Sequence, residues 1–369
     1  TFNHLVAALK QAQIRLILDG VFNHCGDGFW AFRDVVNYGE NSRYRDWFVI
    51  DSFPILFDPP TFQTCGGAPF LPKLNTNNSE VQAYLLDIVK YWVRLGIDGW
   101  RLDVPWKVAT DFWPVFSRTV REINPDTYLV AEVWRGTSDW LNGERVDGVM
   151  NYRLRQNILD FAAFNHMDAE DFDYELRQLL REHGESAPYH LTLLSSHDTP
   201  RVRTLCRGDD NRQIIAITLQ MTLPGVPMIY YGDEIGMEGD NDPDCRRPMI
   251  WQQRRWNKAI FDVTRKLIHL RRTHPALRST QIQILKVFNG MYAYAREQDD
   301  DLVIVVLNSR AVQQSQRIPI GTISGIDRWR EVLTGKQMLA ENGMLHFNPL
   351  HANSAYVLIP ETQHEAHDS

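Results

Sequence analysis

Short apolar runs alternate with helical segments over the first 280 residues, and this alternation most constrains the fold. In segment 79–95, apolar side chains recur every three or four residues along one helical face until Gly96 ends the pattern. Ser79 and Gln82 have capping-box spacing, so we expect Ser79 to cap this helix. Alternating strands and helices are typical of parallel βαβ units. The pattern predicts six strands, at 14–18, 97–102, 128–133, 146–150, 190–194 and 226–231.

Acidic residues lie at or within three of these apolar runs. Asp103 and Asp198 follow their runs, and Glu132 lies inside one. A parallel barrel delivers such side chains to one mouth, at the carboxyl ends of its strands. A single acid after a strand is more often a helix cap or an ion-pair partner. Three of them in this arrangement favour glycosidic chemistry, which uses paired carboxyl groups.

Four segments carry a family resemblance, and they are Leu16–His24, Gly99–Val104, Val130–Trp134 and Leu194–Thr199. In order and spelling they resemble the signature regions of the α-amylase family, glycoside hydrolase family 13. The resemblance implies an α/β fold, a (β/α)8 TIM barrel. Its third strand corresponds to the first strand predicted here, so we expect a barrel that is N-terminally incomplete, with about six strands.

The domain organisation is predicted from the same resemblance and from a change of pattern near residue 280. Beyond it, six short apolar runs separated by turn residues such as Gly290 predict a C-terminal antiparallel β-sandwich domain. The long irregular stretch after the first strand matches the family's domain B. The predicted parts are the barrel at 1–278, domain B at about 25–78, the β domain at 279–360 and a disordered polar tail at 361–369.

The resemblance implies roles for the three acids. Asp103 corresponds to the nucleophile, Glu132 to the acid/base, and Asp198 to a third acid that holds the distorted sugar. Arg101 points to the same side of its strand as Asp103, and its charge is expected to keep Asp103 ionised. Glu132 has the opposite requirement, because it must hold a proton.

Further positions are implied to bind substrate. Leu71–Asn75 and Asp242–Met249 resemble elements of the neopullulanase, cyclomaltodextrinase and maltogenic amylase group. For each position the plainer alternative is a satisfied core histidine, ordinary packing, or a charge paired within its own loop. The residues implied to contact sugar are His24, Arg101, His197, Trp134, Tyr152, Asp242 and Arg246.

The resemblance implies retaining hydrolysis of α-glucosidic bonds in cyclodextrins, maltodextrins or pullulan. One alternative is a transglycosylase or an α-glucoside isomerase, which would use the same three acids. Another is a non-catalytic glucan-binding or scaffold protein, which the presence of all three acids disfavours. After the nucleophile the group usually reads V-A-N-E, whereas this chain reads Val104-Pro105-Trp106-Lys107. We expect this departure to change acceptor binding and linkage preference.

Composition limits the partners. A net charge of -7 argues against a nucleic-acid surface, and no apolar run approaches the roughly 20 residues that span a bilayer. Four scattered cysteines favour reduced thiols and a cytoplasmic location. No organic cofactor is implied. Asn23 corresponds to a calcium ligand in many members, but no metal site is assigned because no other ligand set is evident. Members often dimerise through an N-terminal β domain, so a homodimer is predicted only for a longer form.

Overall fold

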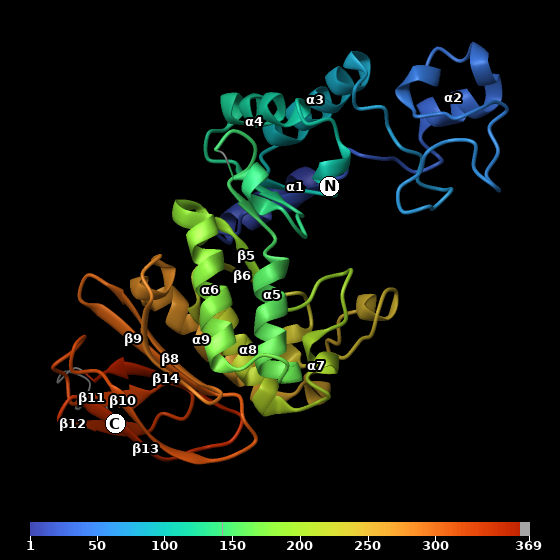
Figure 1. Ribbon diagram of the computed structural model, residues 1–369. Helices are drawn as coiled ribbons and strands as arrows, with labels where there is room; N and C mark the ends of the chain where they lie inside the picture. The colour runs from blue at the N-terminus through green and yellow to red at the C-terminus, as the bar shows by residue number, and fades with distance from the viewer. Residues whose placement is uncertain (142, 362–369) are drawn as a thin grey trace. The chain divides into compact units, whose positions relative to one another are not determined.

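The computed structural model describes residues 1–141 and 143–361, and the chain divides into two compact units, Thr1–Met150 and Asn151–Ser369 (Figure 1). All six predicted parallel strands are present, each shorter than its apolar run. The boundaries predicted for the barrel, domain B and the β domain stay predictions. The predicted disordered tail lies outside the described residues from position 362 onward.

The first unit is built on a parallel sheet of four strands in the order β1-β2-β3-β4. Its strands are β1 (Ile17–Gly20), β2 (Gly99–Leu102), β3 (Tyr128–Ala131) and β4 (Gly148–Val149). Its α-helices are α1 (Phe2–Gln11), α2 (Trp30–Tyr38), α3 (Ser79–Arg94) and α4 (Phe112–Ile123).

The core of the first unit lies between this sheet and its helices. Helix α3 buries Val81, Leu85, Val89 and Val93, the face that its apolar spacing predicts. Its cap differs from the prediction, because the Asn78 side chain accepts from the Glu80 backbone N–H at 2.8 Å. The predicted Ser79 cap is therefore wrong, since an equally good capping residue stands one position earlier.

The segment between β1 and α3 is less irregular than its sequence suggests. It contains α2, which the sequence analysis does not predict, and isolated β-bridges such as His24 with Lys73 and Ile50 with Phe62. Aromatic rings pack edge to face within it, and Trp47 donates from Nε1 to Glu80 of α3 at 2.9 Å. This ring packing holds the segment in the first unit.

The second unit begins with helices and one pair of parallel strands. The strands are β5 (Leu191–Leu193) and β6 (Val226–Met228), which pair from Leu191 with Val226 to Leu193 with Met228. The helices are α5 (Tyr152–Leu159), which continues as a π-helical turn, α6 (Ala169–His183), α7 (Val202–Leu205), α8 (Asp210–Thr222) and α9 (Lys258–Thr273).

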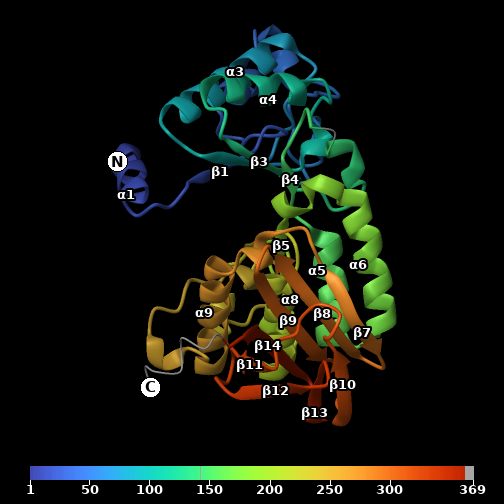
Figure 2. The ribbon, with the colours of Figure 1, turned by 90° about the vertical axis from the view of Figure 1, so that its left-hand side faces the viewer.

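The predicted C-terminal antiparallel domain is present as an eight-stranded sheet in the order β10-β13-β12-β11-β14-β9-β8-β7 (Figure 2). The sheet curls so that its two edge strands, β7 and β10, come into contact. Lys286 of β7 donates to the Gln316 side chain and to the Arg317 carbonyl of β10. The strands are β7 (Gln283–Phe288), β8 (Met291–Gln298), β9 (Asp301–Asn308), β10 (Gln314–Pro319), β11 (Arg328–Glu331), β12 (Gln337–Glu341), β13 (Met344–Leu350) and β14 (Ser354–Pro360).

Strands β8, β9 and β14 are buried on both faces. In β9, Val303 and Val305 join the core that contains the helices, whereas Ile304 and Val306 face the core enclosed by the curled sheet. This double burial explains why β9 is a continuous apolar run from Leu302 to Leu307 and does not alternate with polar residues.

The cap of α3 gives a direct test of this part of the fold. Replacing Asn78 by Ala removes the bond to the Glu80 N–H and the bond from Asn78 Nδ2 to the Asp46 carbonyl. We expect a loss of about 1 kcal/mol in the free energy of unfolding, measured by urea denaturation. The matched control is Ser79→Ala, which should change stability by less than about 0.5 kcal/mol. A larger loss for Ser79→Ala than for Asn78→Ala would contradict the assigned cap.

Candidate active site

In the first unit, three acidic residues are placed around one arginine by the parallel strands. Asp19 of β1 lies opposite Arg101 of β2 in register. Asp103 and Glu132 come directly after β2 and β3, and their backbone N–H groups donate to Gly20 O at 3.1 Å and to Leu102 O at 2.9 Å. The ladder therefore extends one residue beyond each strand, which fixes the backbone positions of both acids.

The Arg101 guanidinium binds all three carboxylates. Its Nη1 lies 2.7 Å from Asp19 Oδ1 and 2.9 Å from Asp103 Oδ1, and its Nη2 lies 2.9 Å from Glu132 Oε2. The side chains of Arg101, Asp103 and Glu132 are mostly buried, so these two ion pairs are largely shielded from water, whereas the Asp19 side chain is half exposed. Asp103 and Glu132 are thus held by one rigid, planar group, which limits how far either carboxylate moves.

Glu132 lies in an environment that favours its protonated form. Burial raises the pKa of Glu132, whereas the Arg101 charge and the Val104 N–H that donates to Oε2 act in the opposite direction. The Asp103 charge raises the pKa further. Trp134 donates from its indole Nε1 to the other oxygen, Oε1, at 3.1 Å. A carboxyl group that is buried, oriented and retains its proton more readily than usual is suited to general acid catalysis.

His24 follows β1, and the structure places it near the same acids. Burial lowers the pKa of His24, although the charges of Asp103 and Asp19 raise it. Its Nδ1 lies 3.3 Å from Asn23 Nδ2. A neutral imidazole is both a donor and an acceptor, as binding of sugar hydroxyls requires.

Asn23 is the residue for which the resemblance implies a calcium ligand. Calcium takes six to eight oxygen ligands. Asn23 Oδ1 is buried without a hydrogen-bond partner and offers one such oxygen. Within residues 1–141 and 143–361, however, no group of three or more His, Cys, Asp or Glu side chains is arranged to hold a metal ion.

The segment after Asp103 adopts an unusual backbone. Val104 has a φ of +32°, in the left-handed region, and Pro105–Lys107 form a 3-10 turn. Trp106 is 46% exposed and lines a hollow of about 250 Å³ together with Trp134 and Trp140. Trp106, which departs from the V-A-N-E pattern, therefore adds an aromatic face next to Trp134, the residue that donates to Glu132 Oε1.

In the second unit, Asp198 follows β5 and is held from two sides. Arg246 Nη2 lies 3.2 Å from Asp198 Oδ1, and His197 Nε2 lies 3.1 Å from Oδ2. The guanidinium of Arg246 also bonds Asp242 Oδ1 at 2.7 Å and the His197 carbonyl at 2.9 Å. The structure thus brings together four of the predicted site residues, which the chain separates by up to 49 positions.

Tyr152 lies beneath this turn. Its side chain is buried, and its hydroxyl bonds Ser196 Oγ at 3.3 Å. Ser196 Oγ in turn accepts from the Asp198 backbone N–H at 3.2 Å. Tyr152 therefore supports the backbone that carries Asp198, and the substrate contact assigned to it stays a prediction.

One buried pair, Arg201 with Asp233, is not predictable from the sequence patterns. Arg201 is fully buried, lies 3.3 Å from Asp233 Oδ1, and donates to the carbonyls of Tyr231 and Cys245. Burial raises the pKa of Asp233 to about 7, against the effects of Ser195 and Arg201. The backbone N–H of Arg201 also donates to the Gly239 carbonyl at 2.9 Å. Arg201 therefore positions the loop that carries Asp242 and Arg246. An arginine three residues after Asp198 gives no sequence signal of this role.

Comparison with known proteins finds a family that matches most of this chain and several similar proteins. The family described as "Alpha amylase, catalytic domain" matches residues 1–273. Neopullulanase 2 of Thermoactinomyces vulgaris is 43% identical over 350 residues, which cover 94% of this chain and 60% of that protein. Cyclomaltodextrinase of Thermoanaerobacter pseudethanolicus is 39% identical over 358 residues, which cover 96% and 61%. The chain thus spans about three fifths of the length of these curated relatives.

A solved structure agrees in fold. The cyclic alpha-maltosyl-(1→6)-maltose hydrolase of Arthrobacter globiformis, in complex with its cyclic substrate, superposes with a TM-score of 0.87 at 36% identity. The match covers 97% of this chain and 78% of that one. At this identity the likeness extends from fold to family.

The ion pairs of Arg101 predict how the Glu132 proton responds to substitution. Replacing Arg101 by Gln removes the positive charge that opposes the effect of burial, so the pKa of Glu132 should rise further. The titration is followed by the carboxyl-carbon NMR signal of Glu132 in labelled protein. Arg101→Lys keeps a charge and should raise the pKa less, and Arg94→Gln, at the exposed end of α3, should leave it unchanged. A lower pKa in Arg101→Gln would contradict this account.

Proposed function

The chain belongs to the alpha-amylase catalytic-domain family, and we propose that it hydrolyses α-glucosidic bonds with retention of anomeric configuration. The single observation that carries the proposal is the Arg101 cluster, in which two carboxyl groups in different environments share one guanidinium. Retaining glycoside hydrolysis needs such a pair, one group to attack and one to transfer the proton.

Asp103 is the proposed nucleophile. Its carboxylate attacks the anomeric carbon, forms a covalent glycosyl-enzyme and releases the leaving sugar. The bond from Arg101 Nη1 orients the attacking group and stabilises its charge before substrate arrives. In the second step water replaces Asp103 at the anomeric carbon, which restores the carboxylate.

Glu132 is the proposed acid and base. It protonates the glycosidic oxygen as the first bond breaks and takes a proton from water in the second step. Its buried position, which raises its pKa, supports the acid role, and the indole N–H of Trp134 holds Oε1 in place. The rate should fall at alkaline pH, because the ionised Glu132 cannot protonate the leaving oxygen.

Other predicted residues are proposed to hold sugar. Asp198 is the third acid, and its carboxylate would accept bonds from hydroxyls of the distorted ring. His197 and His24 would bond hydroxyls as well, and Arg246 with Asp242 would bind the non-reducing side. The bond of Arg246 to Asp198 supports this grouping, since one guanidinium fixes two acceptors for hydroxyl groups.

The proposed substrates are cyclodextrins, maltodextrins and pullulan. The printed names of the relatives, a neopullulanase, a cyclomaltodextrinase and a cyclic maltosyl-maltose hydrolase, support this class. No organic cofactor is proposed. A cytoplasmic location is proposed because all four cysteines are free thiols. No described helix is long and apolar enough to cross a membrane.

Transfer to a sugar acceptor is the second candidate activity, and Trp106 favours it. An exposed indole in the hollow with Trp134 offers a face on which an acceptor ring can stack in place of water. The alternative uses the same covalent intermediate, so only the acceptor differs.

The first test is loss of the nucleophile. Asp103→Asn should reduce the release of reducing sugar from β-cyclodextrin, maltotriose and pullulan by at least about 10⁴-fold, because no covalent intermediate forms. Asp126→Asn, at an exposed position of the same unit, is the matched control and should keep full activity. Absence of activity on all three substrates in the folded unsubstituted chain would refute the hydrolase proposal.

The second test concerns the acceptor. With maltotriose as substrate, Trp106→Ala should lower the ratio of transfer products to hydrolysis products about threefold or more, because the stacking face is lost. Products are separated by chromatography at equal substrate consumption. Tyr91→Ala, an exposed aromatic position on α3, should leave the ratio unchanged. An unchanged ratio in Trp106→Ala would remove this residue from acceptor binding.

A further inference from the structure

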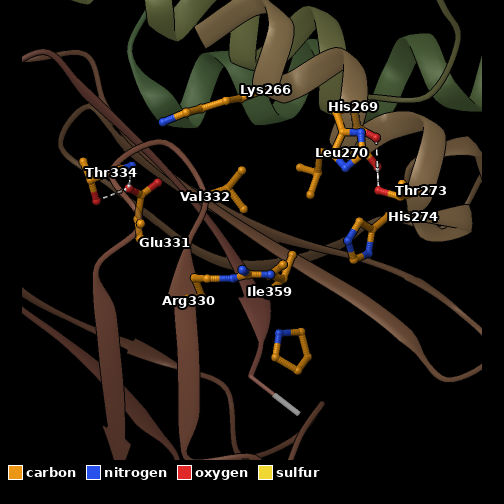
Figure 3. A pocket seen from close by; sticks show the side chains of 12 residues that line it. Lys266, His269, Leu270, Thr273, His274, Arg330, Glu331, Val332, Thr334 and Ile359 are labelled. Carbon is orange, nitrogen blue, oxygen red and sulfur yellow. Dashed lines mark hydrogen bonds between the residues drawn. The ribbon is translucent and has the colours of Figure 1, made fainter. Parts of the chain in front are cut away.

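A second cavity lies in the second unit, between the end of α9 and strands β11 and β14 (Figure 3). Its volume is about 660 Å³, within the range of small-molecule sites. None of the candidate active-site residues lines it. The function proposed above therefore leaves this cavity without a role.

Basic side chains border the cavity. Lys266, His269 and His274 come from α9 and its end, and Arg330 reaches in from β11 (Figure 3). The one acid among the lining residues, Glu331, is buried and accepts hydrogen bonds from the N–H groups of its own turn and of Val357. Both of its carboxylate oxygens therefore already accept hydrogen bonds from the protein, whereas Lys266 and Arg330 bring two positive charges to the lining.

These basic side chains are not needed to cap the helix. Basic residues near a helix C-terminus often serve that purpose. Here Arg278 donates to the carbonyls of Arg271 and Arg272 in the last turn of α9, at 2.8 and 2.9 Å. Lys266 gives one bond to the Leu333 carbonyl, so two of its three N–H donors remain.

The two histidines also keep donor capacity. The Nδ1 atom of His274 lies 2.6 Å from Asp301 Oδ1, which leaves Nε2 for another partner. His269 is exposed, and its ring makes no hydrogen bond within residues 1–141 and 143–361. Lys266, His269 and His274 therefore offer donors to the cavity from α9 and from the helix end.

The rest of the lining suits a ligand with a hydroxylated body. Leu270, Val332 and Ile359 provide apolar surface between the basic groups. The Thr273 hydroxyl donates to the carbonyls of His269 and Leu270, and the Thr334 hydroxyl donates to Glu331. Each hydroxyl oxygen then still accepts a bond from a ligand hydroxyl.

We propose that this cavity binds a small sugar phosphate. A phosphate group presents several strong acceptor oxygens, which match the donors of Lys266, His269 and His274 along α9 and its end. The sugar ring would lie against the apolar surface and donate to the threonine hydroxyls. Because its walls come from α9 and from the curled sheet, a bound ligand stabilises the folded second unit and raises its melting temperature.

Isothermal titration calorimetry of the 369-residue chain with glucose 6-phosphate tests this, with glucose, sulfate and inorganic phosphate compared at equal ionic strength. We expect saturable binding of glucose 6-phosphate, weaker binding of inorganic phosphate, and none of glucose or sulfate. Lys266→Gln and His269→Gln should each weaken binding about tenfold, because each removes a hydrogen bond to a charged group. Arg272→Gln, an exposed cation of the same helix outside the lining, should bind normally.

Proton NMR of the imidazoles gives a second measurement if a variant folds poorly. On addition of glucose 6-phosphate, the signals of His269 and His274 should shift, whereas those of His4 and His351 should not. No saturable heat, equal binding of sulfate, or equal affinity in the His269→Gln protein would overturn the proposal. Equal affinity for inorganic phosphate and glucose 6-phosphate would overturn the role of the sugar ring.

Discussion

The candidate active site depends on one guanidinium, that of Arg101, whose side chain is 13% exposed. Two carboxylates about 5 Å apart repel each other by about 3 kcal/mol at an effective dielectric constant of about 20. Arg101 offsets this repulsion because it lies between Asp103, Glu132 and Asp19. The same charge favours the ionised form of Glu132 and so opposes the acid role. Burial outweighs it, since the pKa of Glu132 is raised on balance. The site thus combines a cation that gathers the acids with burial that raises the pKa of one of them.

In the second unit, too, an arginine holds acidic side chains together. Arg246 holds Asp198 and Asp242, and Arg201 holds the loop that carries Arg246. Arg246 is about half exposed, whereas Arg201 is fully buried. The exposed pair is accessible to ligand hydroxyls, and the buried pair is a scaffold. Preorganised charges of this kind lower the reorganisation needed when substrate binds.

Local sequence patterns predicted the parallel strands and the helix at 79–95, because apolar periodicity reflects burial directly. Helix α5 was missed, since its buried face includes Arg155 and Asn157, which are polar. Strands β12 and β13 were missed because polar residues and Pro349 interrupt them, although Asn342-Gly343 between them is a strong hairpin signal. The observed cap of α3 lies one residue before the predicted one, because two residues that can cap a helix, Asn78 and Ser79, are adjacent. In each case a neighbouring residue or tertiary packing outweighed the local pattern.

Site identity and site geometry differ in how far a sequence determines them. The acids were identifiable because each follows or lies in an apolar run, a local property. Arg101 was identifiable as a partner of Asp103, because it stands two residues earlier on the same strand. The pairs of Arg101 with Asp19 and of Arg201 with Asp233 were not, since they join residues 82 and 32 positions apart. Ion-pair partners are set by strand register and loop packing, which one sequence does not encode locally. The position of a carboxylate therefore follows from a local sequence pattern, whereas distant ion-pair partners follow from the tertiary fold. The pKa of Glu132 depends on burial and on such partners, and so only the folded chain determines it.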